Sequence, residues 1–559
     1  MSRLLLLGLC LAVAAALPAI GGESEPEPPI HEREPRFAVP DDQSLEASGA
    51  VIGDIIIRAG NVFDTSDPAE NNTIFRLANR LHRTTRDPVI EQQLLFRSGE
   101  PFSRRLLDES ERLLRSTRYL YDAQIRPVRY RNNRVDLEVV TRDVWTLTAG
   151  LGVSRSGGEN STRFEIQDTN FLGTGRELAI ERTDDVDRTR QLLSYKDRYL
   201  AGSRTQLELW LAEASDGSLR RLELERPFIS LDSHWGSGLF ARSEERVDPL
   251  YRAGEEVDRF RLRRDYAEIY GGLSRGLVDG WTRRLTAGYT FDRRRFDDAP
   301  DEEPAFRLPP DRTLSYPWIG FEVVEDRYLE TNDIDQLQRT EDFFIGRRAH
   351  ARLGWAAEAF GSDRDRLVFD SGFYAGFEPT ERGLLLISGD LSTRWADSQE
   401  EDLRASLKAR YYQRNFGNNL FFVSAEVDAT SNADQDTQLL LGGDSGLRGY
   451  PLRYQDGDRR FLLTLEQRFY TDWHLFRLLH IGGAVFFDIG RAWFDGEPRE
   501  LPGSPTIRDG VLKDIGIGLR LSSSRSGQGS MIHLDVAFPL DRDGSIRGVQ
   551  WLVSTRDTF

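Results

Sequence analysis

Cysteine is almost absent from this chain of 559 residues: the single one, Cys10, lies within the first 22. Those residues, MSRLLLLGLCLAVAAALPAIGG, place Arg3 before an apolar stretch that is followed by small residues. This pattern predicts a secretory signal peptide over residues 1–22. Once the signal peptide is removed, the chain has no thiol for a disulfide, for metal binding or for nucleophilic catalysis.

Long apolar runs are also missing. No stretch of about 18 apolar residues follows the signal peptide, so the sequence excludes a membrane-spanning helix. A transmembrane β-strand needs an apolar residue only at every second position, and a barrel of such strands keeps the mean hydropathy of a soluble protein. If the chain crosses a membrane, it does so with strands.

Positive charge is in deficit, with a formal net charge of −17 at pH 7. Such an acidic chain is not typical of proteins that bind nucleic acid, so we expect no nucleic-acid partner. The seven histidines are scattered, without an HExxH motif or a paired spacing. We therefore expect no metal site and no cofactor.

The first part of the chain after the signal peptide divides into two segments. Residues 23–50 begin ESEPEPP and show no apolar periodicity, which predicts a disordered linker. Residues 51–144 predict a small α+β domain in the order strand, helix, helix, strand, strand, at 51–57, 88–96, 103–116, 120–130 and 134–141. This order, with the run SGEPFSRRLLDESERLLRSTRYL, resembles a polypeptide-transport-associated (POTRA) domain. An extra helical piece near 71–81 departs from the minimal pattern, and a generic α+β domain is the alternative.

Residues 145–559 alternate apolar and polar side chains in short segments separated by turn residues. In one of them, Ile515, Ile517 and Leu519 alternate with Asp514, Gly516, Gly518 and Arg520. About twenty such segments with hardly any helix between them predict an antiparallel barrel with lipid outside and water inside. The predicted fold is thus an all-β transmembrane barrel preceded by one small α+β domain.

Three motifs and the C-terminus carry further information. The glycine-rich loop at 441–451 contains LRGY, that is Leu447, Arg448, Gly449 and Tyr450. The strand-like FFDIGRAW at 486–493 directs Asp488 towards the lumen by alternation. The third motif, QDTNFLGTGREL, occupies 167–178 near the start of the barrel. The last strand, 547–559, carries Trp551 and ends on Phe559, which is similar to the assembly signal of outer-membrane barrels.

Together with the POTRA-like segment, these motifs resemble the BamA/TamA superfamily of outer-membrane insertases, which is related to two-partner-secretion transporters. The resemblance implies that the LRGY loop folds back into the barrel, where Arg448 meets Asp488. It also implies sixteen strands, five of them after the loop. The segments themselves number five after the loop and about fifteen before it, so we expect sixteen strands and at most about twenty.

The resemblance further implies a location and a mechanism. The barrel would lie in the bacterial outer membrane, in contact with its lipid, with the POTRA-like domain in the periplasm. A weak seam between the first strand, near 145–156, and the last strand, 547–559, would open sideways towards unfolded or secreted polypeptide substrates. Periplasmic partners would bind through the POTRA-like domain.

Other functions remain open. A passive porin or receptor shares the charged lumen, but needs neither a periplasmic domain nor an anchored loop. A dedicated two-partner exporter usually carries two POTRA domains and a helical plug, whereas this chain has room for one domain. Two serine motifs, GLSRG at 272–276 and GDSG at 443–446, lack the helix or the following Gly-Pro that a catalytic serine would need, so we do not expect an enzyme.

Overall fold

The computed structural model describes residues 39–299, 305, 308–417, 419–497, 508–527, 531–542, 544 and 546–556. The predicted signal peptide, the first part of the predicted linker and Phe559 lie outside the described residues. Among the described residues, no helix has the length and apolar character needed to cross a membrane. The described chain forms an N-terminal α+β domain up to residue 144 and a β-barrel from β4 onwards.

The N-terminal domain is built on a three-stranded sheet in the order β1-β3-β2. Strand β1 runs parallel to β3, and β2 forms an antiparallel hairpin with it. Leu107 and Leu114 of α4, seven residues apart on one helical face, are fully buried in the core over the sheet. The elements are α1 (Asp42–Ala47), β1 (Val51–Gly60), α2 (Thr73–Leu81), α3 (Asp87–Glu91), α4 (Arg104–Arg115), β2 (Leu120–Arg131) and β3 (Arg134–Asp143).

Two local features differ from the sequence prediction. Helix α1 lies in the segment predicted as a disordered linker: Asp41 caps it by accepting the Ser44 N–H at 2.7 Å, and Leu45 is fully buried in the domain core. One apolar residue in a polar stretch gives no periodicity, so pattern analysis could not find this helix. Helix α3 ends at Glu91, earlier than predicted, and the buried Leu94 and Phe96 follow it outside the helix.

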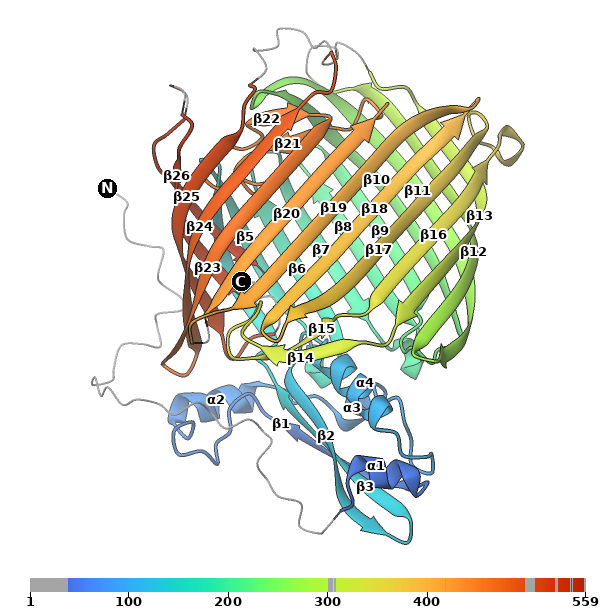
Figure 1. Ribbon diagram of the computed structural model, residues 1–559, viewed down its shortest axis with the longest axis vertical. Helices are drawn as coiled ribbons and strands as arrows, with labels where there is room; N and C mark the ends of the chain where they lie inside the picture. The colour runs from blue at the N-terminus through green and yellow to red at the C-terminus, as the bar shows by residue number, and fades with distance from the viewer. Residues whose placement is uncertain are drawn as a thin grey trace. The chain divides into compact units, whose positions relative to one another are not determined.

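The barrel is closed and antiparallel, which confirms the predicted fold, and it contains twenty strands within the described residues (Figure 1). Fifteen precede the glycine-rich loop and five follow it, so the count lies at the upper end of the expected range. The strands are β4 (Leu147–Ser156), β5 (Glu159–Asp168), β6 (Arg176–Asp184), β7 (Thr189–Asp197), β8 (Gln206–Ala214), β9 (Gly217–Arg226), β10 (Trp235–Arg252), β11 (Glu255–Val278), β12 (Trp281–Asp298), β13 (Arg312–Glu325), β16 (Arg347–Ala356), β17 (Arg366–Thr380), β18 (Gly383–Ala396), β19 (Gln399–Arg414), β20 (Leu420–Ser431), β23 (Arg459–Leu475), β24 (Leu479–Trp493), β25 (Leu512–Ser523), β26 (Met531–Pro539) and β27 (Gln550–Arg556).

Alternation along the strands separates a lumenal face from a lipid-facing one. On β24, Phe486 and Asp488 are buried, whereas Val485, the residue before Phe486, is 44% exposed. On β25, Asp514 is fully buried and Ile517 is 59% exposed. Because apolar side chains lie on the exposed outer face and charged ones on the buried inner face, the barrel surface suits a hydrocarbon environment.

Two loops turn inwards at opposite ends of the barrel. The lid loop, residues 432–458 between β20 and β23, contains the short strands β21 (Leu439–Leu441) and β22 (Gln455–Gly457). The mouth loop, residues 326–346 between β13 and β16, contains the hairpin of β14 (Tyr328–Asn332) and β15 (Thr340–Phe344). Figure 1 shows β14 and β15 at one end of the barrel and β21 and β22 near the other.

The strand pairing is weakest where the barrel closes. Nine residue pairs join β25 to β26, and seven join β26 to β27. Between β27 and β4, one pair is in register among the described residues, Val553 with Arg155. We call this β27–β4 junction the seam.

Candidate functional site: the lid loop and its anchors in the lumen

Arg448 of the lid loop makes a two-pronged ion pair with Asp488 of β24. Its Nε lies 2.7 Å from Asp488 Oδ2 and its second terminal nitrogen 3.0 Å from Oδ1. Arg448 is 6% exposed and Asp488 is fully buried. The planar guanidinium therefore fixes both the position and the orientation of the loop tip, which a single-point contact would not do.

The same guanidinium belongs to a larger buried network. It lies flat over the Phe486 ring, 3.3 Å from the ring centre, and contacts Glu466 at 3.1 Å. Glu466 also binds Arg468 at 3.0 Å. Nearby, Arg520 pairs with Asp535, which lies 3.6 Å from Arg448. The three buried carboxylates Glu466, Asp488 and Asp535 each contact at least one arginine, as the burial of charge requires.

Gly449 and Tyr450 fix the backbone directly after Arg448. The Gly449 N–H donates to Asp514 at 2.9 Å, and a Cβ on Gly449 would lie 2.6 Å from Asp514 Cβ. Only glycine fits this close approach. The fully buried Tyr450 hydroxyl donates to the Lys513 carbonyl at 2.8 Å and accepts the Lys513 N–H at 3.1 Å. Leu447, also fully buried, completes the apolar side of the tip.

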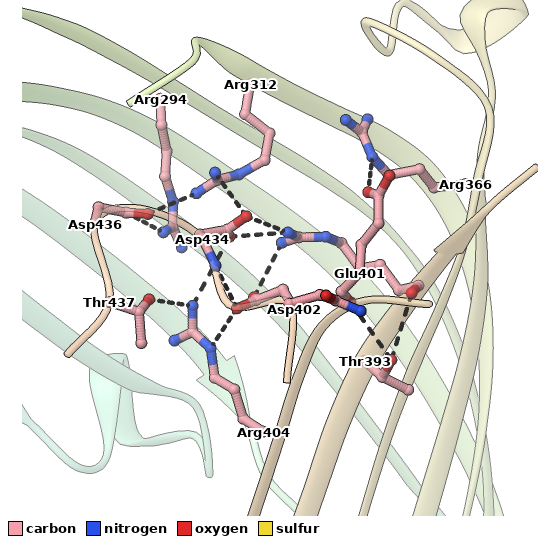
Figure 2. A network of polar contacts seen from close by, with 12 residues as sticks. Arg294, Arg312, Arg366, Thr393, Glu401, Asp402, Arg404, Asp434, Asp436 and Thr437 are labelled. Carbon is pink, nitrogen blue, oxygen red and sulfur yellow. Dashed lines mark hydrogen bonds and ion pairs between the residues drawn. The ribbon is translucent and has the colours of Figure 1, made fainter. Parts of the chain in front are cut away.

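The opposite wall of the barrel holds the start of the lid loop by a second set of ion pairs (Figure 2). Asp434 lies 2.7 Å from Arg394 of β18 and 3.1 Å from Arg312 of β13. Asp436 lies 3.1 Å from Arg294 of β12. The lid loop therefore crosses the lumen between two charged walls, one at β12–β18 and one at β23–β26.

A third set of contacts holds the end of the lid loop. Asp456 pairs with Arg252 of β10 at 2.8 Å, and both side chains are buried. Arg453 forms a two-pronged pair with Asp187 in the turn between β6 and β7, with one contact of 2.9 Å. Sequence reasoning missed the anchors at Asp434, Asp436 and Asp456, because single acidic residues in a loop carry no motif.

The lid loop also touches both sides of the seam. Gly157, in the turn between β4 and β5, lies so close to Leu452 that a side chain at this position has no room. On the other side, the Tyr450 hydroxyl lies 3.2 Å from the Asp541 carbonyl, after β26, and Ile546 packs in the same apolar cluster as Tyr450. One loop therefore bridges the strands that the seam joins only weakly.

The mouth loop fills the other end of the lumen. Ile334 packs with Leu384 and Tyr412 of the barrel wall, and Leu337 packs with Ala484 and Met531. Glu341 holds the turn by accepting the N–H groups of Ile334 and Asp335 at 2.8 and 2.9 Å. These buried contacts order the mouth loop. From the sequence alone, its two short strands could not be told apart from strands of the barrel.

Polar contacts connect the mouth loop to the lid loop and to the N-terminal domain. Asp335 lies 3.1 Å from Arg468, which shares Glu466 with Arg448. At its other face, Asp342 accepts two hydrogen bonds from Arg115 of α4, at 2.6 and 2.7 Å. A continuous chain of contacts thus leads from α4 through the mouth loop to the lid loop.

The QDTNFLGTGREL motif forms the turn between β5 and β6, and its role here is docking. Asn170, 1% exposed, donates to the Thr85 hydroxyl at 2.8 Å and accepts the Gly175 N–H at 2.7 Å. Gly173, at φ +71°, accepts the Arg86 N–H at 3.1 Å. This barrel turn therefore fits against the segment before α3 of the N-terminal domain.

The serines of the GLSRG and GDSG motifs form local hydrogen bonds with the backbone. Ser274 lies within strand β11 with no helix after it, and its hydroxyl accepts the Gly276 N–H at 3.0 Å. The Ser445 hydroxyl accepts the Gly442 N–H at 2.8 Å within the lid loop. The part of the chain that the structure describes contains no group of His, Cys, Asp and Glu side chains able to hold a metal ion.

Trp551 lies on the lipid-facing side of β27 and is 62% exposed.

No family model matches the chain, and no curated protein matches it. Solved structures similar to it include BamA from Haemophilus ducreyi lacking POTRA domains 1–3, at 15% identity and a TM-score of 0.37, covering 90% of this chain and 85% of that one. CdiB from Acinetobacter baumannii is similar at 12% identity and a TM-score of 0.44, covering 90% and 73%. CdiB from Escherichia coli is similar at 12% identity and a TM-score of 0.46, covering 91% of this chain and 76% of that one. Likeness at this level identifies no function.

The Arg448–Asp488 pair is testable by mutation. We expect Arg448→Ala and Asp488→Ala each to destabilise the folded barrel by about 3–5 kcal/mol, because each leaves a buried charge without its partner. The double variant Arg448→Asp with Asp488→Arg is expected to recover part of the loss. The measurement is the midpoint of urea unfolding, followed by the gel mobility of the folded barrel.

Lys408→Ala provides the matched control, since it removes a more exposed lumenal pair with Glu426 at 3.4 Å. Exposed pairs contribute about 0–1 kcal/mol, so its midpoint should barely change. Additive losses in the two single variants, without recovery in the exchanged double variant, would contradict the pairing.

The mouth loop should respond to pH through Glu341. Burial raises the pKa of Glu341 from 4.5 to about 8, against the opposing hydrogen bond from the Ile334 N–H. The folded loop therefore prefers the protonated carboxyl, and its stability falls as pH rises from about 4.5 through 8. In a Cys10→Ser background, we expect Leu337→Cys, at a position 3% exposed, to react with a thiol reagent faster at pH 8 than at pH 5, after correction for thiolate content.

Glu341→Gln should reduce this pH dependence. Burial also raises the pKa of Asp333 in the same loop, so part of the pH dependence is expected to remain. An equal corrected rate at both pH values in the protein with Glu341 intact would show that Glu341 does not control the loop.

Proposed function

We propose that this chain assists the insertion, assembly or translocation of polypeptides at the bacterial outer membrane, through the seam and the lid loop. Two features together carry the proposal. Two loops of the chain itself occupy the lumen, and the strands that close the barrel, β27 and β4, share one residue pair in register among the described residues. A polypeptide strand can pair with a strand edge that its neighbour leaves unbonded. Two further observations support this function. The sequence motifs resemble those of insertases, and the N-terminal domain would serve as a POTRA-like domain in the periplasm.

A passive porin is the less favourable alternative. Its lumen must stay open to water, whereas here buried ion pairs hold the lid loop to walls on opposite sides, at Asp434 and at Arg448. Breaking and remaking such pairs suits a lumen that opens transiently. A receptor or a dedicated exporter of one secreted partner shares this arrangement, and cellular consequences of its loss distinguish these functions.

The first test locks the seam. In a Cys10→Ser background, Arg155→Cys and Val553→Cys place two thiols on the residues that pair across the seam. We expect the oxidised double variant to fail to restore outer-membrane protein composition in depleted cells, and a reductant to restore it. Proteomics of the outer membrane and the medium gives the measurement, and shows whether many barrels or one secreted polypeptide depend on the chain.

Leu407→Cys with Val427→Cys is the matched control. These two residues pair across the continuous β19–β20 ladder and are 47% and 49% exposed. Oxidation of this pair should leave function unchanged. If the seam-locked variant restores composition as fully as this control, the seam does not open during function.

The second test measures ion conductance in planar bilayers. We expect small, flickering openings, since the lid loop and the mouth loop occupy the lumen. Asp434→Asn with Asp436→Asn should lengthen the openings, because the neutral side chains lose charge-assisted bonds to Arg294, Arg312 and Arg394. A large, steady, ohmic pore in the unaltered protein would instead support the porin.

A further inference from the structure

Helix α2 presents an apolar face that no other part of the described chain covers. Ile74, Leu77 and Leu81 follow a helical spacing of three and four residues and are 50%, 54% and 68% exposed. Asn72 caps the helix by accepting the Phe75 N–H at 2.9 Å, so the helix is locally well formed. Three large aliphatic side chains on one exposed stripe are costly in water and indicate an apolar surrounding.

The neighbouring face of α2 fixes the helix beside the barrel. Phe75 stacks on Phe63, and both belong to an apolar cluster with Trp145, at the entry to the first barrel strand, and Leu478, in the turn between β23 and β24. Asp67, in the segment before α2, pairs with Arg477 of that turn at 3.2 Å. The helix is therefore held against the barrel end next to the seam.

The end of β23 and the turn that follows it, next to the α2 cluster, carry exposed aromatic side chains. Trp473 is 67% exposed and Phe476 is 65% exposed. Exposed aromatic residues at the ends of barrel strands form the girdle that lies at the membrane–water interface. Because this turn packs against the α2 cluster, α2 lies at about the depth of that girdle.

The charge on α2 suits the same location. From residue 73 to 83 the chain carries Arg76, Arg80 and Arg83 and no acidic residue, although the whole chain has a net charge of −17. Within the described residues, none of these arginines forms an ion pair, and Arg76 donates only to Asn71 and Thr73. A short helix with one apolar face and flanking arginines is typical of segments that lie in the surface of an anionic bilayer.

We propose that α2 lies in the lipid surface at the end of the barrel that carries the N-terminal domain, which under the proposed function is the periplasmic leaflet. Ile74, Leu77 and Leu81 insert between the acyl chains, and Arg76 and Arg80 bind the phosphates of anionic phospholipid. The helix thus anchors the N-terminal domain to the membrane beside the seam. The proposal depends on the barrel spanning a bilayer and on no particular polypeptide substrate.

The experiment places a fluorophore on the helix of the full-length protein. In a Cys10→Ser background, Leu77→Cys is labelled with a polarity-sensitive dye, and the protein is reconstituted in vesicles of phosphatidylethanolamine and phosphatidylglycerol. We expect a blue-shifted emission and loss of most of the fluorescence when lipids carrying a spin label on the acyl chain are included. Ile517→Cys, on the lipid-facing side of β25, gives the reference for full contact with acyl chains.

Arg131→Cys, exposed at the tip of the β2–β3 hairpin, is the matched control on the same domain and should show neither the shift nor the quenching. Adding Arg76→Gln and Arg80→Gln to the labelled protein should reduce quenching in the anionic vesicles but not in vesicles of phosphatidylcholine alone. A label at Leu77→Cys that behaves like the one at Arg131→Cys would overturn the proposal. This result would assign the apolar face to a protein partner or a second copy, and would leave the seam-locking test unaffected.

Discussion

The desolvated guanidinium of Arg448 is the constraint on which the lumen depends. A buried charge is stable only when opposite charges and hydrogen bonds replace the water that it has lost. Asp488 supplies the two-pronged partner, Glu466 supplies a second carboxylate, and the Phe486 ring covers the flat face. These three groups come from β23 and β24, so the position of the lid tip and the register of this hairpin stabilise each other.

The lid loop and the mouth loop work as one polar framework inside a wide barrel. A twenty-stranded barrel has more interior than its own strand side chains can fill, so loops of the chain must occupy it or water will. The lid loop spans the lumen between charged walls, and the mouth loop packs its apolar residues against the opposite end. Arg468 joins them, since it binds Glu466 on one side and Asp335 on the other. Because Asp342 also binds Arg115 of α4, a movement of the N-terminal domain would reach the mouth loop through that pair. It would then reach the lid loop through the pairs Asp335–Arg468, Arg468–Glu466 and Glu466–Arg448.

Sequence patterns predicted the barrel and the small α+β domain, because alternation with a period of two is a local property of each strand. Counting segments gave about twenty strands, whereas the family resemblance implied sixteen; the local count was nearer. The resemblance named Arg448 and Asp488, which lie in contact. It did not name Asp434, Asp436, Asp456 or Asp335, because their partners lie on strands distant in sequence and no local pattern marks them. The mouth loop escaped notice for a related reason: its order comes from burial in the lumen, which sequence periodicity does not report.

The position of the lid loop explains how a barrel with so weak a closing ladder remains closed. Strand pairing at the seam contributes few backbone hydrogen bonds among the described residues, so other contacts must hold β4 and β27 together. Leu452 packs against Gly157 on the β4 side, while Tyr450 binds the backbone near Asp541 on the other. Tyr450 and Leu452 both lie within a few positions of Arg448 in the sequence. Loss of the Arg448–Asp488 pair would therefore loosen the contacts at Tyr450 and Leu452 as well as the loop tip, so the seam and the lid loop are coupled. A closed state that depends on the ion pairs of the lid loop, rather than on a continuous ladder, can be reversed without unfolding the other nineteen strand junctions.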